Sequence, residues 1–365
     1  MRKLGLNVET ARLENLTCPL PLPAGETILL GHGSGGRLSG ELIRRVFLPA
    51  FRSNVLARLE DQAVVALGAA GPASAGPRIA FTTDSFVVRP IFFPGGDIGR
   101  LAVHGTVNDL AVGGAVPLFL SAAFILEEGL PIADLERIAA SMSAASAEAG
   151  VDLVTGDTKV VDRGKGDLVF ITTSGIGLVP EGRSLSIHSA RPGDRILLSG
   201  TIGDHGIAVM SVREGLEFEG TLASDTAPLA GLTQVMLAAC PRIRCMRDPT
   251  RGGLAGVLHE LAAASGVGIR IVESAIPVRP EVRGACELLG LDPLYIANEG
   301  KLIAVVPAGD ADRLLETMQA HSVGRRAAII GEITAEHPGL LVMRSLIGGE
   351  RVVTLPASEP LPRIC

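Results

Sequence analysis

The sequence predicts a mixed α+β fold of two domains followed by a tail. Its 365 residues are enough for two units of roughly 150 residues each. Patterns of period two alternate along the chain with patterns of period three to four, which indicates strands and helices that share cores. Forty-five glycines are too many for a plain helical bundle, and with aromatics at 3% the cores must consist mainly of aliphatic side chains.

The first half alternates helix and strand patterns after an irregular lead-in over residues 1–26, which contains Cys18. A helix at 98–112 is predicted from apolar residues that recur every three or four positions, and a helix at 132–149 is closed by Gly150. The other predicted elements of this half are a strand at 27–30, a glycine-rich loop at 31–36, a helix at 38–51 and strands at 80–88, 116–125, 151–161 and 168–178.

A Pro-Gly turn at Pro192-Gly193 divides the chain. The last ten residues, 356–365, contain three prolines and no period, which predicts an extended tail. We therefore expect an N-terminal domain at 27–188, a C-terminal α/β domain at 189–350 and a flexible tail at 351–365. The elements predicted for the second domain are strands at 195–199, 268–272 and 302–306 and helices at 254–265, 280–289 and 311–320.

Charge and hydropathy exclude several classes of function. The net charge of −6 gives no electrostatic footprint for nucleic acid. The longest strongly apolar stretch, residues 117–126, is too short to cross a bilayer, and residues 1–25 lack the apolar block of a signal peptide. Five cysteines, an odd number, argue against a disulfide scaffold. We expect a cytoplasmic protein with neither a nucleic-acid nor a membrane partner.

Five aspartates at predicted strand ends or beside glycine are the most informative feature of the chain. Mg²⁺ prefers oxygen ligands and usually bridges one or two carboxylates to substrate phosphates. Neighbouring glycines allow backbone N–H groups to approach phosphate oxygens. Any one of these aspartates alone is typical of a residue that caps a turn, but the set favours a metal–nucleotide site. The set is Asp61, Asp84, Asp109, Asp157 and Asp248.

Three further segments could serve the same site, although no Walker A pattern is present. Lys159 would place a compact positive charge near a transferring phosphoryl group. Arg251-Gly252-Gly253 opens a helical pattern, where backbone amides can receive an anion or the glycines merely form a loop. Residues 298–301 combine an amide, a carboxylate and a cation. They form either a surface turn or, if the fold turns Glu299 toward the aspartates, a part of the site.

A cysteine as the last residue is an unusual feature. Cys365 is not four residues from the end, as a prenylation signal requires. The tail from Pro356 could reach roughly 30 Å if it were extended. A thiol on such a tether can visit an active site as a carrier arm does, and the alternative is an accidental tail cysteine.

Nine short segments carry a family resemblance when they are taken together. They are 32–36 (His-Gly-Ser-Gly-Gly), 92–96 (Phe-Phe-Pro-Gly-Gly), 105–109 (Gly-Thr-Val-Asn-Asp), 124–129 (Phe-Ile-Leu-Glu-Glu-Gly), 155–161, 203–206 (Gly-Asp-His-Gly), 248–253, 298–301 (Asn-Glu-Gly-Lys) and 362–365 (Pro-Arg-Ile-Cys). The chain with these segments resembles the HypE family of hydrogenase-maturation proteins, within the PurM-like ATP-binding superfamily that includes the AIR synthetases.

The resemblance implies a two-domain PurM-like fold, whose first domain binds ATP with Mg²⁺ and forms the contact of a homodimer. It implies a carbamoyl dehydratase. A partner carbamoyltransferase, HypF, would load a carbamoyl group onto Cys365, and ATP would activate the carboxamide oxygen by phosphorylation. Loss of phosphate and protons would leave a thiocyanate. Its cyanide would pass to iron on a HypC–HypD scaffold complex, for the nickel–iron centre of [NiFe]-hydrogenase.

The motif match also implies a role for each candidate residue. Asp61, Asp84 and Asp248 would bind Mg²⁺ or phosphate. Lys159 would stabilise the γ-phosphoryl group, and Cys365 would carry the substrate. Glu299 would be the base, with Asp109 as its rival. The residues expected around the nucleotide are Asp61, Asp84, Asn108, Asp109, Asp157, Thr250 and Gly252.

Two alternatives remain at this stage. A selenophosphate synthetase or an AIR synthetase would share the fold. The former requires a reactive Cys or selenocysteine in the glycine-rich region, and residues 31–36 have none. Neither explains a terminal cysteine. The other alternative is a non-catalytic binding module whose tail docks on a partner and for which nucleotide is a switch. ATP hydrolysis that requires Cys365 would separate this module from an enzyme.

Overall fold

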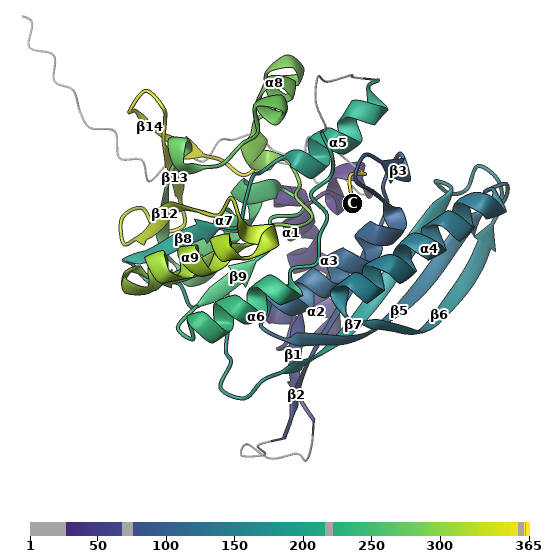
Figure 1. Ribbon diagram of the computed structural model, residues 1–365, viewed down its shortest axis with the longest axis horizontal. Coiled ribbons are helices and arrows are strands. Elements are labelled where there is room, and N and C mark those ends of the chain that lie inside the picture. Colours follow the sequence, from purple (N-terminus) through teal and green to yellow (C-terminus); the bar gives the residue numbers. More distant parts are fainter. Residues whose placement is uncertain (1–26, 68–75, 216–221, 357–360, 362) are drawn as a thin grey trace, which may run out of the picture.

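The polypeptide folds into two large sheets, each with helices packed against it (Figure 1). The computed structural model describes residues 27–67, 76–215, 222–356, 361 and 363–365. The lead-in and its Cys18 lie outside these residues. In the part of the chain that is described, no helix is long and apolar enough to span a bilayer.

The first sheet has five strands among the described residues, in the order β1-β2-β7-β5-β6. Strands β5 and β6 are parallel, and the other neighbours are antiparallel. Parallel neighbours need a crossover connection, and helix α4 (Ile132–Ala149) provides it. The strands are β1 Ala63–Ala66, β2 Arg78–Phe86, β5 Val116–Glu127, β6 Asp152–Val161 and β7 Val169–Val179.

Helix α3 (Ile98–Val112) covers one face of this sheet, where it packs on β2 and β7 and against α4 (Figure 1). Asp97 caps the helix, because its carboxylate accepts hydrogen bonds from the amides of Gly99 at 2.8 Å and Arg100 at 3.0 Å. A Cβ on Gly105 would lie 2.8 Å from the ring of Phe86, so this glycine allows the helix to approach the sheet closely. The far end of α3 also contacts β9 of the second sheet.

The other face of the first sheet exposes a group of apolar side chains, which we call the open face. Phe81, Ile176 and Phe119 lie side by side in register on β2, β7 and β5. Each is at least 38% exposed, although buried residues alternate with them along these strands. The open face comprises Phe81, Val116, Phe119, Ile125, Ile176 and Leu178.

The second sheet has seven strands in the described chain, in the order β14-β13-β10-β12-β8-β11-β9, and only β10 and β13 are parallel neighbours. Both faces are buried. Ile196 and Leu198 of β8 share a core with α7, whereas Leu197 between them packs with α6 and α9. The strands are β8 Asp194–Leu198, β9 Cys245–Arg247, β10 Gly268–Val272, β11 Ile303–Pro307, β12 Ala328–Thr334, β13 Leu341–Arg344 and β14 Glu350–Val353; the helices are α6 Ala230–Ala239, α7 Gly253–Ser265 and α9 Ala311–Ala320.

A third core joins the two halves, and the end of the chain lies in it. Leu361 and Ile364 are 4% and 1% exposed and belong to the same cluster as residues of α3, α5 (Asp204–Arg213) and α8 (Pro280–Leu289). Figure 1 shows the C-terminus beside the short hairpin of β3 (Phe92–Phe93) and β4 (Gly96–Asp97). The described residues of the tail are therefore docked on the protein.

The predicted mixed α+β class is confirmed, and several elements have the predicted bounds, among them the helix at 98–112 and the strand at 268–272. The predicted helix at 38–51 is helical as α1 (Gly36–Leu42), a π-helical turn (Ile43–Phe47) and α2 (Leu48–Phe51). The predicted strand at 27–30 is wrong. Residues Leu30–Gly33 form a 3-10 turn, because the glycine-rich loop that follows favours a turn over a strand.

Candidate active site

Three aspartates from different elements meet at one point. Carboxylate oxygens of Asp61, Asp109 and Asp248 all lie within 4.8 Å of one another. Asp61 precedes β1, Asp109 lies near the end of α3, and Asp248 directly follows β9. The group therefore combines an edge of the first sheet, its covering helix and the edge of the second sheet.

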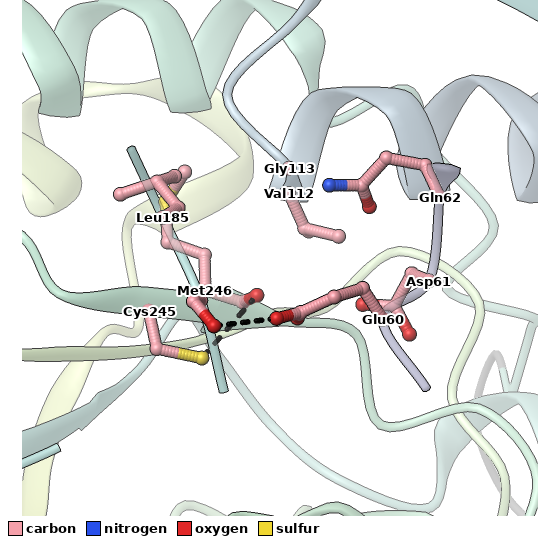
Figure 2. Close-up of a pocket in the computed structure, with 9 residues that line it drawn as sticks. Glu60, Asp61, Gln62, Val112, Gly113, Leu185, Cys245 and Met246 are labelled. Carbon is pink, nitrogen blue, oxygen red and sulfur yellow. Dashed lines mark hydrogen bonds between the residues drawn. The ribbon is translucent and has the colours of Figure 1, made fainter. Parts of the chain in front are cut away.

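The residues beside Asp61 hold it in place (Figure 2). The carboxylate of Glu60 accepts a hydrogen bond from the hydroxyl of Ser186 at 2.5 Å. Gln62 lies against Gly113 at the end of α3, where a Cβ would come within 1.8 Å of the Gln62 side-chain nitrogen. Because both neighbours are held in this way, the direction of the Asp61 side chain is fixed.

Thr82 of β2 links the other members of the group. Its hydroxyl lies 2.8 Å from a carboxylate oxygen of Asp109 and 2.9 Å from the carbonyl oxygen of Asp61. Asp84 lies two residues along the same strand, on the same face of the sheet, and accepts a weak hydrogen bond from Thr106 of α3 at 3.4 Å. Asp84 and Asp109 thus lie along the contact of α3 with β2, and Thr82 joins this contact to the backbone of Asp61.

The group of carboxylates that could hold a metal ion differs in one member from the metal ligands expected from the sequence, which were Asp61, Asp84 and Asp248. Asp109 completes the tight group, and Asp84 borders it. The reason is topological. Asp109 projects from the end of α3 that contacts β9, where Asp248 follows, whereas Asp84 faces the middle of the helix at Thr106.

Burial and mutual repulsion disfavour the ionised form of the three aspartates. Burial raises the pKa of Asp61 well above its usual value, against the lowering effect of Arg247. Burial also raises the pKa of Asp109, and the charges of Asp84, Asp248 and Asp61 add to the rise. The pKa of Asp248 rises to about 6, mainly through burial and against the effect of Arg247.

The cluster of three aspartate carboxylates fits Mg²⁺. Its donors are hard oxygens, and they lie close enough for a single ion to contact them. A divalent cation would also relieve the repulsion that raises these pKa values. Asp61, Asp109 and Asp248 are the residues that would hold the ion.

Glu299 lies beside the aspartates, in the turn before β11. Its side chain is 3% exposed, and its Oε1 has no hydrogen-bond partner among the described residues. Burial raises the pKa of Glu299 well above its usual value, and the charges of Asp225, Asp248 and Asp84 raise it further. The fold thus turns this carboxylate toward the group, as the site interpretation of residues 298–301 requires.

The loop before α7 lies on another side of the group. Its Gly252 has a φ of +80° and is the N-cap of the helix, and the amide of Gly253 donates to the carbonyl oxygen of Thr250 at 2.9 Å. The Arg251 side chain donates to the carbonyl oxygen of Gly33 at 3.3 Å, which brings the N-terminal glycine-rich loop against this turn. This turn, with Thr250 and Gly252, directly follows Asp248 and begins α7.

Asn108 plays a different part from its neighbour Asp109. It is 1% exposed, and its amide nitrogen donates to the carbonyl oxygens of Ala227 and Glu299 at 3.0 and 3.1 Å. Its side-chain oxygen accepts from the amide of Leu229 at 2.8 Å. These bonds use both amide hydrogens, so Asn108 ties together two segments of the second half.

Within one copy of the chain, Asp157 and Lys159 lie away from the group of Asp61, Asp109 and Asp248. Both are on the edge strand β6, with side chains 64% and 69% exposed, and they form an ion pair at 2.7 Å. That hydrogen bond lowers the pKa of Asp157. Lys159 is in register with Ile125 of the open face, so it projects from the side of the sheet opposite α3.

Cys365 is half-buried at the end of the docked tail. A backbone oxygen of Cys365 accepts from the amide of Val87 at 3.3 Å, and the carbonyl oxygen of Arg363 accepts from the amide of Arg89 at 3.2 Å. The tail therefore runs along the segment that directly follows β2. An ion pair between Arg363 and Asp167 at 2.6 Å also holds it.

Two family models match most of the chain. The N-terminal domain of AIR synthase related proteins matches residues 59–179, and the C-terminal domain of the same proteins matches residues 191–342. The carbamoyl dehydratase HypE of Azotobacter vinelandii is 59% identical over 334 residues, which are 92% of this chain and 96% of that protein. The chain belongs to the HypE family.

Solved structures of the HypE family share the fold as well as the sequence. A crystal structure of a HypE–HypF complex contains a chain that is 50% identical with a TM-score of 0.80, covering 86% of this chain and 99% of that chain. A structure of HypE in complex with ATP is 48% identical with a TM-score of 0.76, covering 93% and 100%. The predicted PurM-like fold and HypE family membership are confirmed, so this chain is an enzyme of the carbamoyl dehydratase family.

Two charged residues beside the candidate site were not found from the sequence. Arg247 forms an ion pair with Asp61 at 2.8 Å, and Asp225 forms one with Lys301 at 2.9 Å. Arg247 directly precedes Asp248, which is a signal that could have drawn attention to it. Asp225 gives no such signal, because its partners lie far away in the sequence.

Proposed function

We propose that this chain dehydrates a carbamoyl group, carried as a thiocarboxamide on Cys365, to a thiocyanate in a reaction that cleaves ATP. The proposal rests on family membership and on the position of the tail. We also propose 27–188 and 189–350 as the bounds of its two domains, with 351–365 as the carrier tail.

The position of the terminal residues is the observation that carries the proposal. Cys365 pairs with Val87, three residues after Asp84 on the same stretch of chain. Three residues of extended chain span roughly 10 Å. A short movement of Cys365 alone, with Ile364 still bonded to His205, would therefore bring the terminal sulfur toward Asp84 at the border of the aspartates, as a carrier arm requires.

The chemistry balances as a dehydration. The γ-phosphoryl group of ATP is transferred to the carboxamide oxygen, and ADP leaves. The nitrogen loses two protons, the C–O bond breaks with departure of phosphate, and a C≡N triple bond remains on the sulfur. Phosphorylation is necessary because the oxygen of an amide is a poor leaving group and a phosphate ester oxygen is a good one.

The three aspartates and Glu299 have different roles at the proposed site. Asp61, Asp109 and Asp248 hold Mg²⁺, which neutralises phosphate charge when it is bound. Glu299 accepts a proton from the substrate nitrogen, and its buried position with an Oε1 that has no hydrogen-bond partner among the described residues supports this role. Thr250 and Gly252 bind the nucleotide from the start of α7.

We propose that two copies pair through the open face and that Lys159 acts across this contact. Large exposed apolar surfaces on a chain of this size are typical of interaction sites. Lys159 lies on the open-face side of β6, so its own aspartates are on the other side of the sheet. Within one copy, Lys159 and the aspartates are therefore separated by the sheet. A second copy, paired through the open face, can bring its Lys159 and Asp157 to the γ-phosphoryl group bound by the first.

We further propose HypF as the carbamoyl-loading partner, supported by the solved HypE–HypF complex of a 50% identical chain. The acceptor of the product is a HypC–HypD iron scaffold complex, and the site of action is the cytoplasm. Both follow from the family role in [NiFe]-hydrogenase maturation.

The deciding experiment is the mass of the C-terminal peptide. After incubation with HypF and its substrates, the peptide should gain one carbamoyl group on Cys365, and after Mg-ATP it should lose one water. ATP turnover should disappear in Cys365→Ala. No adduct in the presence of active HypF, or ATP hydrolysis that is indifferent to Cys365, would leave a nucleotide-switched binding module as the better interpretation.

A further inference from the structure

Asp225 holds both ends of the turn that presents Glu299. One of its carboxylate oxygens accepts a hydrogen bond from the backbone amide of Glu299 at 3.0 Å. The other lies 2.9 Å from the ammonium group of Lys301, and the two side chains are 4% and 10% exposed. Because the bonds span Gly300, they fix the direction in which the Glu299 side chain leaves the backbone.

The backbone around Asp225 is packed tightly against this turn. A Cβ on Gly300 would lie 2.0 Å from the carbonyl oxygen of Asp225 and 2.8 Å from the amide nitrogen of Ala227. Asn108 bonds to both sides, since it donates to the carbonyl oxygens of Ala227 and Glu299. Segments 224–227 and 299–301 therefore have no room to move independently of each other.

The same segment is bonded to the tail through one imidazole. Nε2 of His205 lies 2.9 Å from the carbonyl oxygen of Ile364, and Nδ1 lies 2.8 Å from the hydroxyl of Ser224. A carbonyl oxygen only accepts, so Nε2 carries the proton and Nδ1 accepts from Ser224. His205 is fully buried, and burial lowers its pKa, which favours the neutral ring.

We propose that Asp225 is a positioning residue for Glu299, and that segment 224–227 couples docking of the C-terminal tail to the placement of the Glu299 carboxylate. The path runs from Ile364 through His205, Ser224 and Asp225 to Glu299. The catalytic consequence rests on the proposed function: the base is held in place when the carrier tail is docked. Coupling of this kind is reciprocal, so a well-placed Glu299 turn also favours the docked tail.

Hydrogen exchange tests the coupling without any substrate. The probe is the amide of Glu299, followed in a peptide that covers residues 298–302. Asp225→Ala removes its acceptor and should accelerate its exchange roughly tenfold or more. A chain without residues 361–365 should also show faster exchange of this amide. An unchanged exchange rate in the shortened chain would overturn the coupling.

Ser224→Ala is the matched variant for the path. It removes the hydroxyl that joins His205 to the segment, which also accepts from the amide of Thr226 at 3.2 Å, and leaves Asp225 in place. In this background, removal of residues 361–365 should have a smaller effect on Glu299 exchange than it has in the wild-type chain. Equal effects in the two backgrounds would show that the tail acts on Glu299 by another route and would overturn the proposed one.

Single-turnover kinetics tests the positioning role. On carbamoylated chain, Asp225→Ala should lower the rate of water loss roughly a hundredfold while the KM for ATP changes by less than about twofold. Asp225→Asn keeps an acceptor for the Glu299 amide and should lose only about tenfold. A merely structural role would change KM and folding together, and the two variants would then be alike.

The two proposals can fail separately. If the wild-type carbamoylated chain loses no water with Mg-ATP, the proposed function is wrong, and the exchange experiment still decides the coupling. If the wild-type chain loses water and Asp225→Ala does so at the same rate, the positioning role of Asp225 is wrong while the proposed function stands.

Discussion

The guanidinium group of Arg247 lies 2.8 Å from a carboxylate oxygen of Asp61, and the two side chains are 10% and 13% exposed. The same guanidinium lies 2.8 Å from Glu260 and donates to the carbonyl oxygen of Leu59. A buried cation thus stands at the edge of a group of carboxylates that would otherwise repel one another.

Arg247→Met should destabilise the metal-free protein by about 3–5 kcal/mol, because it leaves the Asp61 carboxylate buried without its counter-charge. Asp61→Asn removes that charge, so the double variant Arg247→Met/Asp61→Asn should be more stable than Arg247→Met alone. Urea unfolding of the three variants measures both effects. A single Arg247→Met variant as stable as the wild type would contradict the prediction.

His104 predicts an acid-sensitive step in stability. Its ring is fully buried on α3 with Nδ1 3.2 Å from the Thr226 hydroxyl, and its pKa is lowered to about 3, mainly by burial and also by Arg100. The folded chain keeps the ring neutral, whereas the unfolded chain binds a proton below the usual pKa of about 6.5. This contribution to stability is therefore present above pH 6.5 and is lost as the pH falls toward 3.

Between pH 7 and pH 5, the contribution of His104 to the free energy of unfolding should fall by about 2 kcal/mol. His104→Gln cannot titrate, so its stability should fall by that much less over the same range. Urea unfolding at both pH values measures the difference, which isolates His104 from His205 and from the acidic groups. Parallel pH profiles for the two chains would contradict the assignment.

Much of the fold could be predicted because its signals are local. The period of α3 and the glycine after α4 mark those helices in the sequence itself. Helix α5 was missed because it is buried on nearly all sides and shows no clear apolar stripe. The short strands β9 and β14 have too few residues to show a period.

The aspartates of the site could be predicted, but the contacts among them could not. Positions at predicted strand ends or beside glycine pointed to Asp61, Asp109 and Asp248 one by one. Which three meet depends on the contact of α3 with β9, a tertiary feature. The exposed position of Lys159 depends equally on sheet order, since β6 is an edge strand.

Lys159→Ala should remove activity without affecting folding. The Lys159 side chain is 69% exposed, and in the described chain its only ion pair is with the exposed Asp157. The free energy of unfolding should therefore change by less than about 0.5 kcal/mol. Loss of a cation at a transferring phosphoryl group should lower the dehydration rate roughly a hundredfold or more. Lys165→Ala, at another exposed lysine, is the control and should keep full activity. Normal turnover of Lys159→Ala would remove this lysine from the mechanism.

Phe119→Asp should convert a dimer into monomers. Phe119 is 45% exposed in the middle of the open face, and an aspartate there would place a charge in the proposed contact. Leu346→Asp is the matched control, because Leu346 is 63% exposed but lies in the second half of the chain. Light scattering gives the mass of each variant. A dimer that survives Phe119→Asp would show that the copies pair through a different surface.

Gly300→Ala should be far more damaging than an ordinary glycine substitution. A Cβ at Gly300 would lie 2.0 Å from the Asp225 carbonyl oxygen, whereas a Cβ at Gly309 would meet nothing within 4 Å. We expect Gly300→Ala to cost about 3 kcal/mol in urea unfolding, because the two segments must separate, and Gly309→Ala to be nearly neutral.

The activity of Gly300→Ala should fall more than its stability explains, because the separation of the two segments also displaces Glu299. Turnover measured at a temperature where the variant is fully folded separates these two effects. Full activity in that folded variant would mean that the close packing of Asp225 on Gly300 supports the fold alone and leaves the base where the reaction needs it.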